Sequence, residues 1–175
     1  MNLENYLIVQ ESVNSGLTDI TSPEELYKWM TSHIRYRDFI KLQSPEETER
    51  LGCGSCHDQV LFEIKCLRAM HLKVKTIFFM EIDESSGQGG MTHSFVVYTH
   101  KDRGLIGTYW FEHAASNWSG IRKYDSVNAI KTFIKSEHDA GKWGNRKSYP
   151  TVVFGTFKGS PGDDLQTIVT KSLGE

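Results

Sequence analysis

The chain has 175 residues, 38% of them hydrophobic, and a formal net charge of −2 at pH 7. This length and apolar content are typical of one domain that buries its own core. The Lys and Arg residues are scattered, which indicates neither a nucleic-acid surface nor a polybasic membrane patch. We therefore expect a single domain over residues 1–175, with no nucleic acid and no membrane among its partners.

The first residues lack the positive charge and the apolar core of a secretory signal. No apolar run in the sequence is long enough to span a bilayer. These features predict a cytoplasmic protein. Three cysteines, an odd number, favour reduced thiols over a disulfide framework. The sequence does not indicate an oligomeric state.

Helical patterns fill the first part of the chain. Ser22, followed by Pro23 and by Glu25 three residues after it, has the pattern of a helix start with a capping box. Ser44 opens the same pattern for a short helical turn that ends at Gly52. We expect helical segments over residues 2–14, 22–34, 44–52 and 55–71.

The helix over 55–71 has the clearest pattern of the four. Ser55 and Asp58 have the S-x-x-D spacing of a capping pair at its start. One face repeats at helical spacing and predicts a buried stripe, which consists of Val60, Ile64, Leu67 and His71.

Strand patterns, rich in β-branched and aromatic residues, follow this helix. We expect strands over residues 74–82, 92–99, 105–112 and 152–158, and helices over 125–138 and 163–172. The Gly-rich segment 83–90 is predicted to be a flexible loop, and with residue 91 a candidate lid over an active site. The first three strands then form an antiparallel meander. Helices followed by a sheet indicate an α+β fold and not a doubly wound βαβ fold.

Residues 52–58, with the sequence GCGSCHD, carry the densest chemical signal in the chain. If Ser55 caps the helix, Cys56 is its first residue, beside unpaired N–H groups and the positive end of the helix dipole. That position stabilises a thiolate, and the same N–H groups can stabilise an oxyanion. Cys56 is therefore a candidate nucleophile. The alternative is a small packed residue, because free cysteines are often buried and inert.

Two other cysteine chemistries fit less well. Cys53 and Cys56 form a C-x-x-C pair, but a redox pair of this kind belongs in a βαβ unit, and residues 44–52 are helical in pattern. A zinc site needs a second pair of ligands, whereas Cys66 lies in mid-helix without one. We expect no metal and no cofactor at this site.

A histidine and a glutamate are placed to complete a nucleophilic site. His93 starts a predicted strand after the Gly-rich segment, and Glu112 ends the next strand, where a buried carboxylate needs a partner. In a hairpin, Glu112 becomes a cross-strand neighbour of His93 and can orient its ring. Judged alone, each residue is more often structural. His113 is a second candidate base, on the opposite face from Glu112.

Taken together, these segments resemble the transglutaminase-like superfamily, which shares the papain-like cysteine fold. The matching segments are Gly54-Ser55-Cys56-His57-Asp58, Thr92-His93-Ser94-Phe95-Val96 and Trp110-Phe111-Glu112-His113. The likeness spans residues 22–115, and the C-terminal segment 116–175 carries no motif. The family usually has Asp where this chain has Glu112, and often Trp where it has Phe95.

The resemblance implies a nucleophilic-helix and antiparallel-sheet core, with Cys56 as nucleophile, His93 as base and Glu112 as the orienting carboxylate. It implies attack on an amide carbonyl through a thioester. Tyr36 and Gln43 are candidate oxyanion or substrate residues. The expected substrate is a protein, a peptide or a small amide.

The acceptor of the acyl group decides the product of such an enzyme. Hydrolysis is the first expectation, because water is always present, and protein crosslinking is the alternative when an amine accepts. The rival outside catalysis is a binding module that keeps the fold. In that case Trp118 and Trp143 would be exposed anchors for a partner.

Overall fold

The computed structural model of the chain describes residues 19–102 and 105–174. The helix expected over residues 2–14 lies outside this part of the chain. The described elements are, in chain order, α2 (Pro23–His33), β1 (Arg35–Tyr36), α3 (Pro45–Leu51), β2 (Cys53–Gly54), α4 (Cys56–Ala69), β3 (Lys73–Asp83), β4 (Gln88–Asp102), β5 (Leu105–Glu112), β6 (Gly120–Tyr124), α5 (Val127–Asp139), β7 (Thr151–Gly155) and α6 (Leu165–Leu173).

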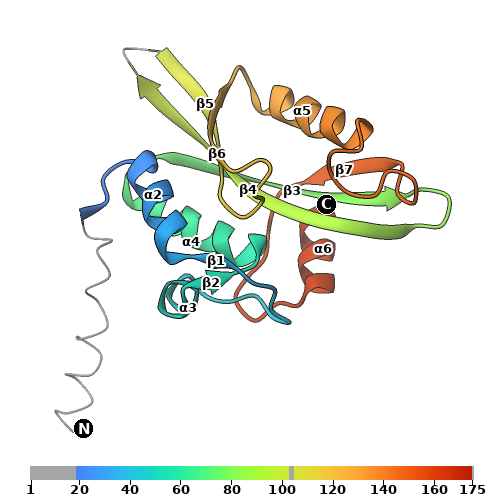
Figure 1. Ribbon diagram of the computed structural model, residues 1–175, viewed down its shortest axis with the longest axis horizontal. Helices are drawn as coiled ribbons and strands as arrows, with labels where there is room; N and C mark the ends of the chain where they lie inside the picture. The colour runs from blue at the N-terminus through green and yellow to red at the C-terminus, as the bar shows by residue number, and fades with distance from the viewer. Residues whose placement is uncertain (1–18, 103–104, 175) are drawn as a thin grey trace, which may run out of the picture.

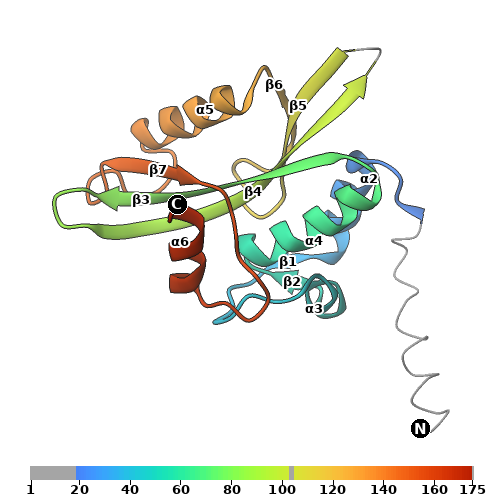
Figure 2. The ribbon, with the colours of Figure 1, turned by 180° about the vertical axis from the view of Figure 1, so that it is seen from behind.

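Five strands form one antiparallel sheet in the order β6-β5-β4-β3-β7. Helix α5 covers one face of this sheet, and α2, α4 and α6 lie on the other (Figures 1 and 2). Strands β1 and β2 form a separate parallel pair next to α3 and α4. The architecture confirms the α+β prediction, with α4, which begins at Cys56, packed on the sheet. No described helix is long and apolar enough to cross a membrane.

The two faces of the sheet build two hydrophobic cores, because strand side chains alternate between faces. Phe78 and Val96 belong to the core under α2 and α4. Phe79 and Phe95 belong to the core under α5, where they join Ile130. Burial on both faces explains why β3 and β4 carry nearly continuous apolar runs instead of an alternating pattern.

Half of the segment predicted as a loop over 83–90 is strand. Strand β4 begins at Gln88, and only residues 84–87 form the turn after β3. The glycines that suggested a loop allow close packing instead. A Cβ at Gly89 would lie 3.0 Å from the Sδ atom of Met80, and one at Gly90 would lie 2.6 Å from the ring of Tyr149. The predicted loop between these two strands is therefore confirmed only as the turn over 84–87, and the lid stays a prediction.

Two further expectations about side chains were wrong. Trp118 is only 2% exposed and stacks on the partly buried Trp143, with ring centroids 5.5 Å apart, so neither is an exposed anchor. Both rings pack against Phe79 in the core under α5. His71 is exposed with φ of 60°, because α4 has already ended at Ala69. Strands β1, β2 and β6 are too short to show a clear strand pattern in the sequence, and they were not predicted.

The start of α4 is held by one buried carboxylate. Ser55 is the N-cap, and its hydroxyl accepts a hydrogen bond from the Asp58 N–H, as the capping spacing predicted. Oδ2 of Asp58 accepts from the N–H and the hydroxyl of Ser55, each at 2.7 Å. Oδ1 of Asp58 accepts from the Gln43 N–H at 2.7 Å and so ties the preceding loop to the helix. This network fixes the position of Cys56, the first residue of α4.

We predict that Asp58→Ala lowers the free energy of unfolding by about 2–4 kcal/mol, because it leaves one buried and two partly buried donors without their acceptor. Urea denaturation measures the loss. Glu25→Ala is the matched control, since the Glu25 carboxylate also accepts three hydrogen bonds at the start of a helix but is exposed. Water replaces it there, so we expect a much smaller loss. Equal losses for the two variants would contradict this account of α4.

Candidate active site

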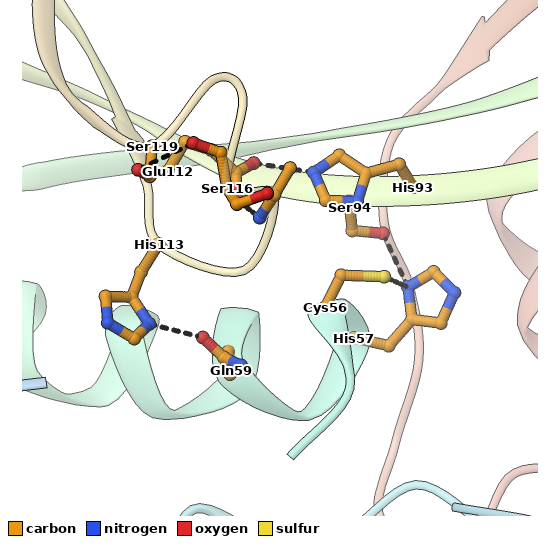
Figure 3. A network of polar contacts seen from close by, with 10 residues as sticks. Cys56, His57, Gln59, His93, Ser94, Glu112, His113, Ser116 and Ser119 are labelled. Atoms are coloured by element: carbon orange, nitrogen blue, oxygen red, sulfur yellow. Dashed lines mark hydrogen bonds and ion pairs between the residues drawn. The ribbon is translucent and has the colours of Figure 1, made fainter. Parts of the chain in front are cut away.

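Cys56 lies where the capping pattern placed it, at the first position of α4. The residue is 4% exposed and lines a cavity of about 360 Å³. The cavity also contacts the loop before α3, residues of β4 and the start of α6. Figure 3 shows the Cys56 side chain directed from the start of α4 toward β4, near His93 and Ser94. The thiol is thus at the bottom of an opening and not sealed in the core.

His93 and Glu112 form a buried pair above α4 (Figure 3). Nε2 of His93 lies 2.6 Å from Oε2 of Glu112, and both side chains are almost fully buried. Oε1 of Glu112 accepts a hydrogen bond of 2.7 Å from the Ala115 N–H. The loop after β5 therefore holds the carboxylate, and the carboxylate holds the ring of His93. The sequence predicted this partnership.

The route by which the two residues meet differs from the prediction. His93 is in the interior of β4 and not at its start. The ladder between β4 and β5 stops at the pair Val96 and Phe111. Glu112 therefore lies one residue beyond the last pair, and it reaches His93 diagonally across the end of β5. The extra methylene of Glu over Asp suits this longer diagonal span.

Electrostatics favour a charged pair at the thiol. Burial alone raises the pKa of Cys56, but attraction to His57 and then to His93, with hydrogen bonds to both rings, lowers that pKa to about 6. Burial alone lowers the pKa of His93, but the charges of Glu112 and Cys56 raise it well above its ordinary value. The site therefore stabilises a thiolate next to an imidazolium at neutral pH. Nδ1 is the ring nitrogen of His93 that Glu112 leaves free for the sulfur.

His57 is a second histidine at the thiol, and no pattern in the sequence predicted a role for it. Its Nδ1 lies 3.7 Å from the sulfur of Cys56 and 2.9 Å from the hydroxyl oxygen of Ser94. The ring stacks on Phe157, with centroids 5.6 Å apart. Its signal in the sequence was its place directly after Cys56 in the first turn of the helix. Among the described residues no carboxylate hydrogen-bonds to it, in contrast to His93.

The two candidate oxyanion residues have different settings. Tyr36 lines the cavity with Cys56, and its hydroxyl donates to Oδ1 of Asp38 at 2.8 Å. Burial, followed by the charge of Cys56, raises its pKa, so the hydroxyl keeps its proton. Gln43 is buried, and both polar atoms of its side-chain amide are closed to solvent without a hydrogen-bond partner. A substrate oxygen cannot reach that amide in this conformation.

Other polar groups surround the site without contacting the sulfur. Nδ1 of His113 lies 2.7 Å from Oε1 of Gln59, whose Nε2 donates to the carbonyl of Gly54. His113 is therefore engaged in holding α4. Glu63, one of the buried residues of α4, has its pKa raised by burial and then by the charge of Glu112. Its surroundings therefore favour the protonated form beside the charged pair, and no pattern in the sequence separated it from a surface glutamate.

No group of three or more His, Cys, Asp or Glu side chains within residues 19–102 and 105–174 is arranged to hold a metal ion. The chain matches no protein-family model, and it has no significant similarity to a curated protein. A function has to be inferred from the chemistry of the site itself.

We predict that iodoacetamide alkylates Cys56 with a pH profile that has its midpoint near pH 6. The thiolate is the reactive form, and its fraction falls as pH falls through a lowered pKa. The alkylation rate should be roughly ten times lower at pH 5 than at pH 7 and nearly constant above pH 7. Peptide-level mass spectrometry measures the rate for each cysteine.

Cys66 is the internal control in the same experiment. Burial raises the pKa of its thiol to about 12, so it should stay almost unlabelled at neutral pH. A Cys56 rate that keeps rising up to pH 9, as for an ordinary thiol, would show that its pKa is not lowered.

Proposed function

We propose that the chain is a cysteine-dependent acyl-transfer enzyme with a transglutaminase-like, papain-like core, and that it hydrolyses an amide or peptide bond through a thioester. The observation that carries the proposal is the buried contact of 2.6 Å between His93 and Glu112 beside a thiol whose pKa is lowered to about 6. Perturbed acid and base groups that meet at a cavity are typical of active sites.

The first half of the reaction forms the thioester. The Cys56 thiolate attacks the carbonyl carbon of the amide, the C–S bond forms, and the π electrons move to the carbonyl oxygen. The resulting oxyanion collapses and the C–N bond breaks. The amine nitrogen takes the proton from the His93 imidazolium and leaves, so His93 is neutral next to an acylated Cys56.

The second half restores the enzyme. Neutral His93 takes a proton from a water molecule as its oxygen attacks the thioester carbonyl. The C–S bond then breaks, the carboxylic acid leaves, and Cys56 is again a thiolate next to an imidazolium. Glu112 stabilises each imidazolium that forms and keeps the ring oriented between the two halves.

Two donors suit the oxyanion. The backbone N–H of Cys56 is in the first turn of α4, where N–H groups have no partner within the helix and the helix dipole is positive. The protonated hydroxyl of Tyr36 donates to Asp38 in the described conformation, and we assign it as the side-chain donor that turns from Asp38 to the oxyanion when substrate binds. Gln43 is not assigned, because its amide is closed to the cavity in the described conformation.

His93 is a better base than His57 because its ring is hydrogen-bonded to the Glu112 carboxylate. A carboxylate stabilises the imidazolium and fixes the tautomer that leaves Nδ1 for the sulfur. His57 contributes through its charge, since its attraction is the largest factor that lowers the pKa of Cys56. We therefore assign His57 as a positioning and electrostatic residue.

The acyl acceptor distinguishes the two enzymatic alternatives. Hydrolysis is proposed first, and crosslinking requires an amine to reach the thioester before water does. The binding-module alternative loses support, because Trp118 and Trp143 pack in the core and offer no exposed anchor.

The mechanism predicts which variants fail with p-nitrophenyl acetate, a small acyl donor. Cys56→Ala should give no acyl-enzyme. His93→Ala and Glu112→Gln should lower turnover by about 10²–10⁴-fold and accumulate an acetyl group on Cys56, because deacylation needs the base. Release of p-nitrophenolate and intact-protein mass spectrometry provide the two readouts.

The exposed His100 of β4 gives the matched control, and His100→Ala should turn over the ester at the wild-type rate. His57→Ala should retain deacylation while the pH midpoint of alkylation rises. If His57→Ala stops deacylation and His93→Ala does not, the base has been assigned to the wrong histidine.

A further inference from the structure

Exposed apolar side chains gather around the cavity at Cys56. Seven large apolar side chains are exposed in the described part of the chain: Tyr36, Ile40, Leu51, Met91, Leu105, Ile106 and Leu165. Four of the seven, namely Tyr36, Ile40, Met91 and Leu165, line this one cavity. Ile40 is 90% exposed. Apolar surface concentrated at a cavity indicates contact with a ligand, since isolated apolar residues are otherwise spread over a surface.

The walls of the cavity come from segments far apart in the sequence. The loop before α3 gives Ile40 and the buried Leu42, strand β4 gives Met91, and α6 gives Leu165 and the buried Ile168. The C-terminal segment, which carried no motif, thus provides one wall of the cavity at the thiol. A substrate group in this cavity contacts apolar atoms on three sides.

Backbone hydrogen bonds fix these walls relative to each other. The Leu42 N–H donates to the carbonyl of Asp163, and the Gly162 N–H donates to the carbonyl of Leu42, both at 2.7 Å. The backbone of Met91 is fixed as well, because its N–H donates to the buried Glu81 carboxylate at 3.2 Å. The cavity is therefore largely formed before a ligand enters, which lowers the entropic cost of binding.

The carboxylates that line the cavity already have partners within the protein. Asp58 accepts from Ser55 and Gln43, Asp163 forms an ion pair of 2.7 Å with Lys171, and Asp38 accepts from Tyr36. Lys171 compensates the charge of Asp163, and the hydrogen bonds engage the oxygens of Asp58 and Asp38 that would otherwise be free to bind a cationic side chain. The volume of about 360 Å³ is at the low end of ligand pockets, so it suits one side chain and its carbonyl.

We infer that the substrate of Cys56 is an amide whose acyl portion carries a large apolar side chain, seated between Ile40, Met91 and Leu165. This inference rests on the proposed function and names its substrate class. The apolar group leaves water as it enters the cavity and brings its carbonyl to the sulfur. One well-matched apolar group contributes about 10–200-fold to selectivity in enzymes.

The test uses N-acetyl amino-acid chloromethyl ketones with Leu, Phe, Ala, Asp and Lys side chains. The thiolate displaces chloride from each reagent and forms a stable C–S bond, so the rate reports how well the side chain places the reagent at Cys56. Each rate is divided by the rate of that reagent with glutathione. We expect Leu and Phe to react at least about tenfold faster than Ala, Asp and Lys.

Two rim variants and one control locate the preference. For each variant, the Leu and Ala rates are first divided by its iodoacetamide rate. Ile40→Ser and Leu165→Ser should then each lower the ratio of the Leu to the Ala rate severalfold. Ile106→Ser is the control, because the exposure of Ile106 lies between those of Leu165 and Ile40, but it is on the β4–β5 hairpin away from the cavity. It should leave the ratio unchanged. All three positions are exposed, so these variants should keep the fold, which circular dichroism verifies.

The possible outcomes separate the two proposals. Fast iodoacetamide labelling of Cys56 without a preference for Leu or Phe overturns the apolar substrate class alone. A faster reaction of the Asp or Lys reagent does the same and assigns a charged substrate. Slow labelling of Cys56 by every reagent overturns the proposed function itself.

Discussion

The contact between His93 and Glu112 is the interaction on which the site depends. Burying an imidazolium is costly unless a negative group compensates its charge, and Glu112 does so at 2.6 Å. The charged ring then stabilises the thiolate of Cys56, which the start of α4 also favours. If the carboxylate is removed, the same burial works against the imidazolium, and the pKa of His93 falls. Burial and the charge of Glu112 raise the pKa of the nearby Glu63, which disfavours a second carboxylate charge at the site.

The fold brings Cys56, His93 and Glu112 together because one helix begins and one strand ends at the site. Helix α4 begins at Cys56 because Ser55 and Asp58 cap it there. The pairing of β5 with β4 stops before His93, which leaves the ring, packed against Phe79 and Trp118, open on that side to Cys56 and Glu112. Glu112 is the last residue of β5 and reaches into the same gap. The site is thus a junction of one helix start and one strand end, a place where backbone polar groups and a cavity are both available.

Local signals explain what the sequence made predictable. The Ser55–Asp58 cap needs only neighbouring residues, and the order of Cys56, His93 and Glu112 in the chain suggested their partnership. The rest depends on contacts between distant segments. Tyr149 packs on Gly90 and converts a loop-like composition into strand, and Ser94 turns His57 toward the sulfur from 37 residues away. The burial of Trp118 and the cavity wall from α6 have the same non-local origin.

A titration of His93 by ¹⁵N NMR tests the central claim most directly. The account predicts that the His93 ring of the wild-type protein carries two protons at pH 7, and that its pKa falls in Glu112→Gln because the compensating charge is gone. Cys56→Ala should lower the same pKa, since the thiolate also stabilises the imidazolium. A neutral His93 ring at pH 7 in the wild-type protein, or a titration that neither substitution changes, would contradict the account.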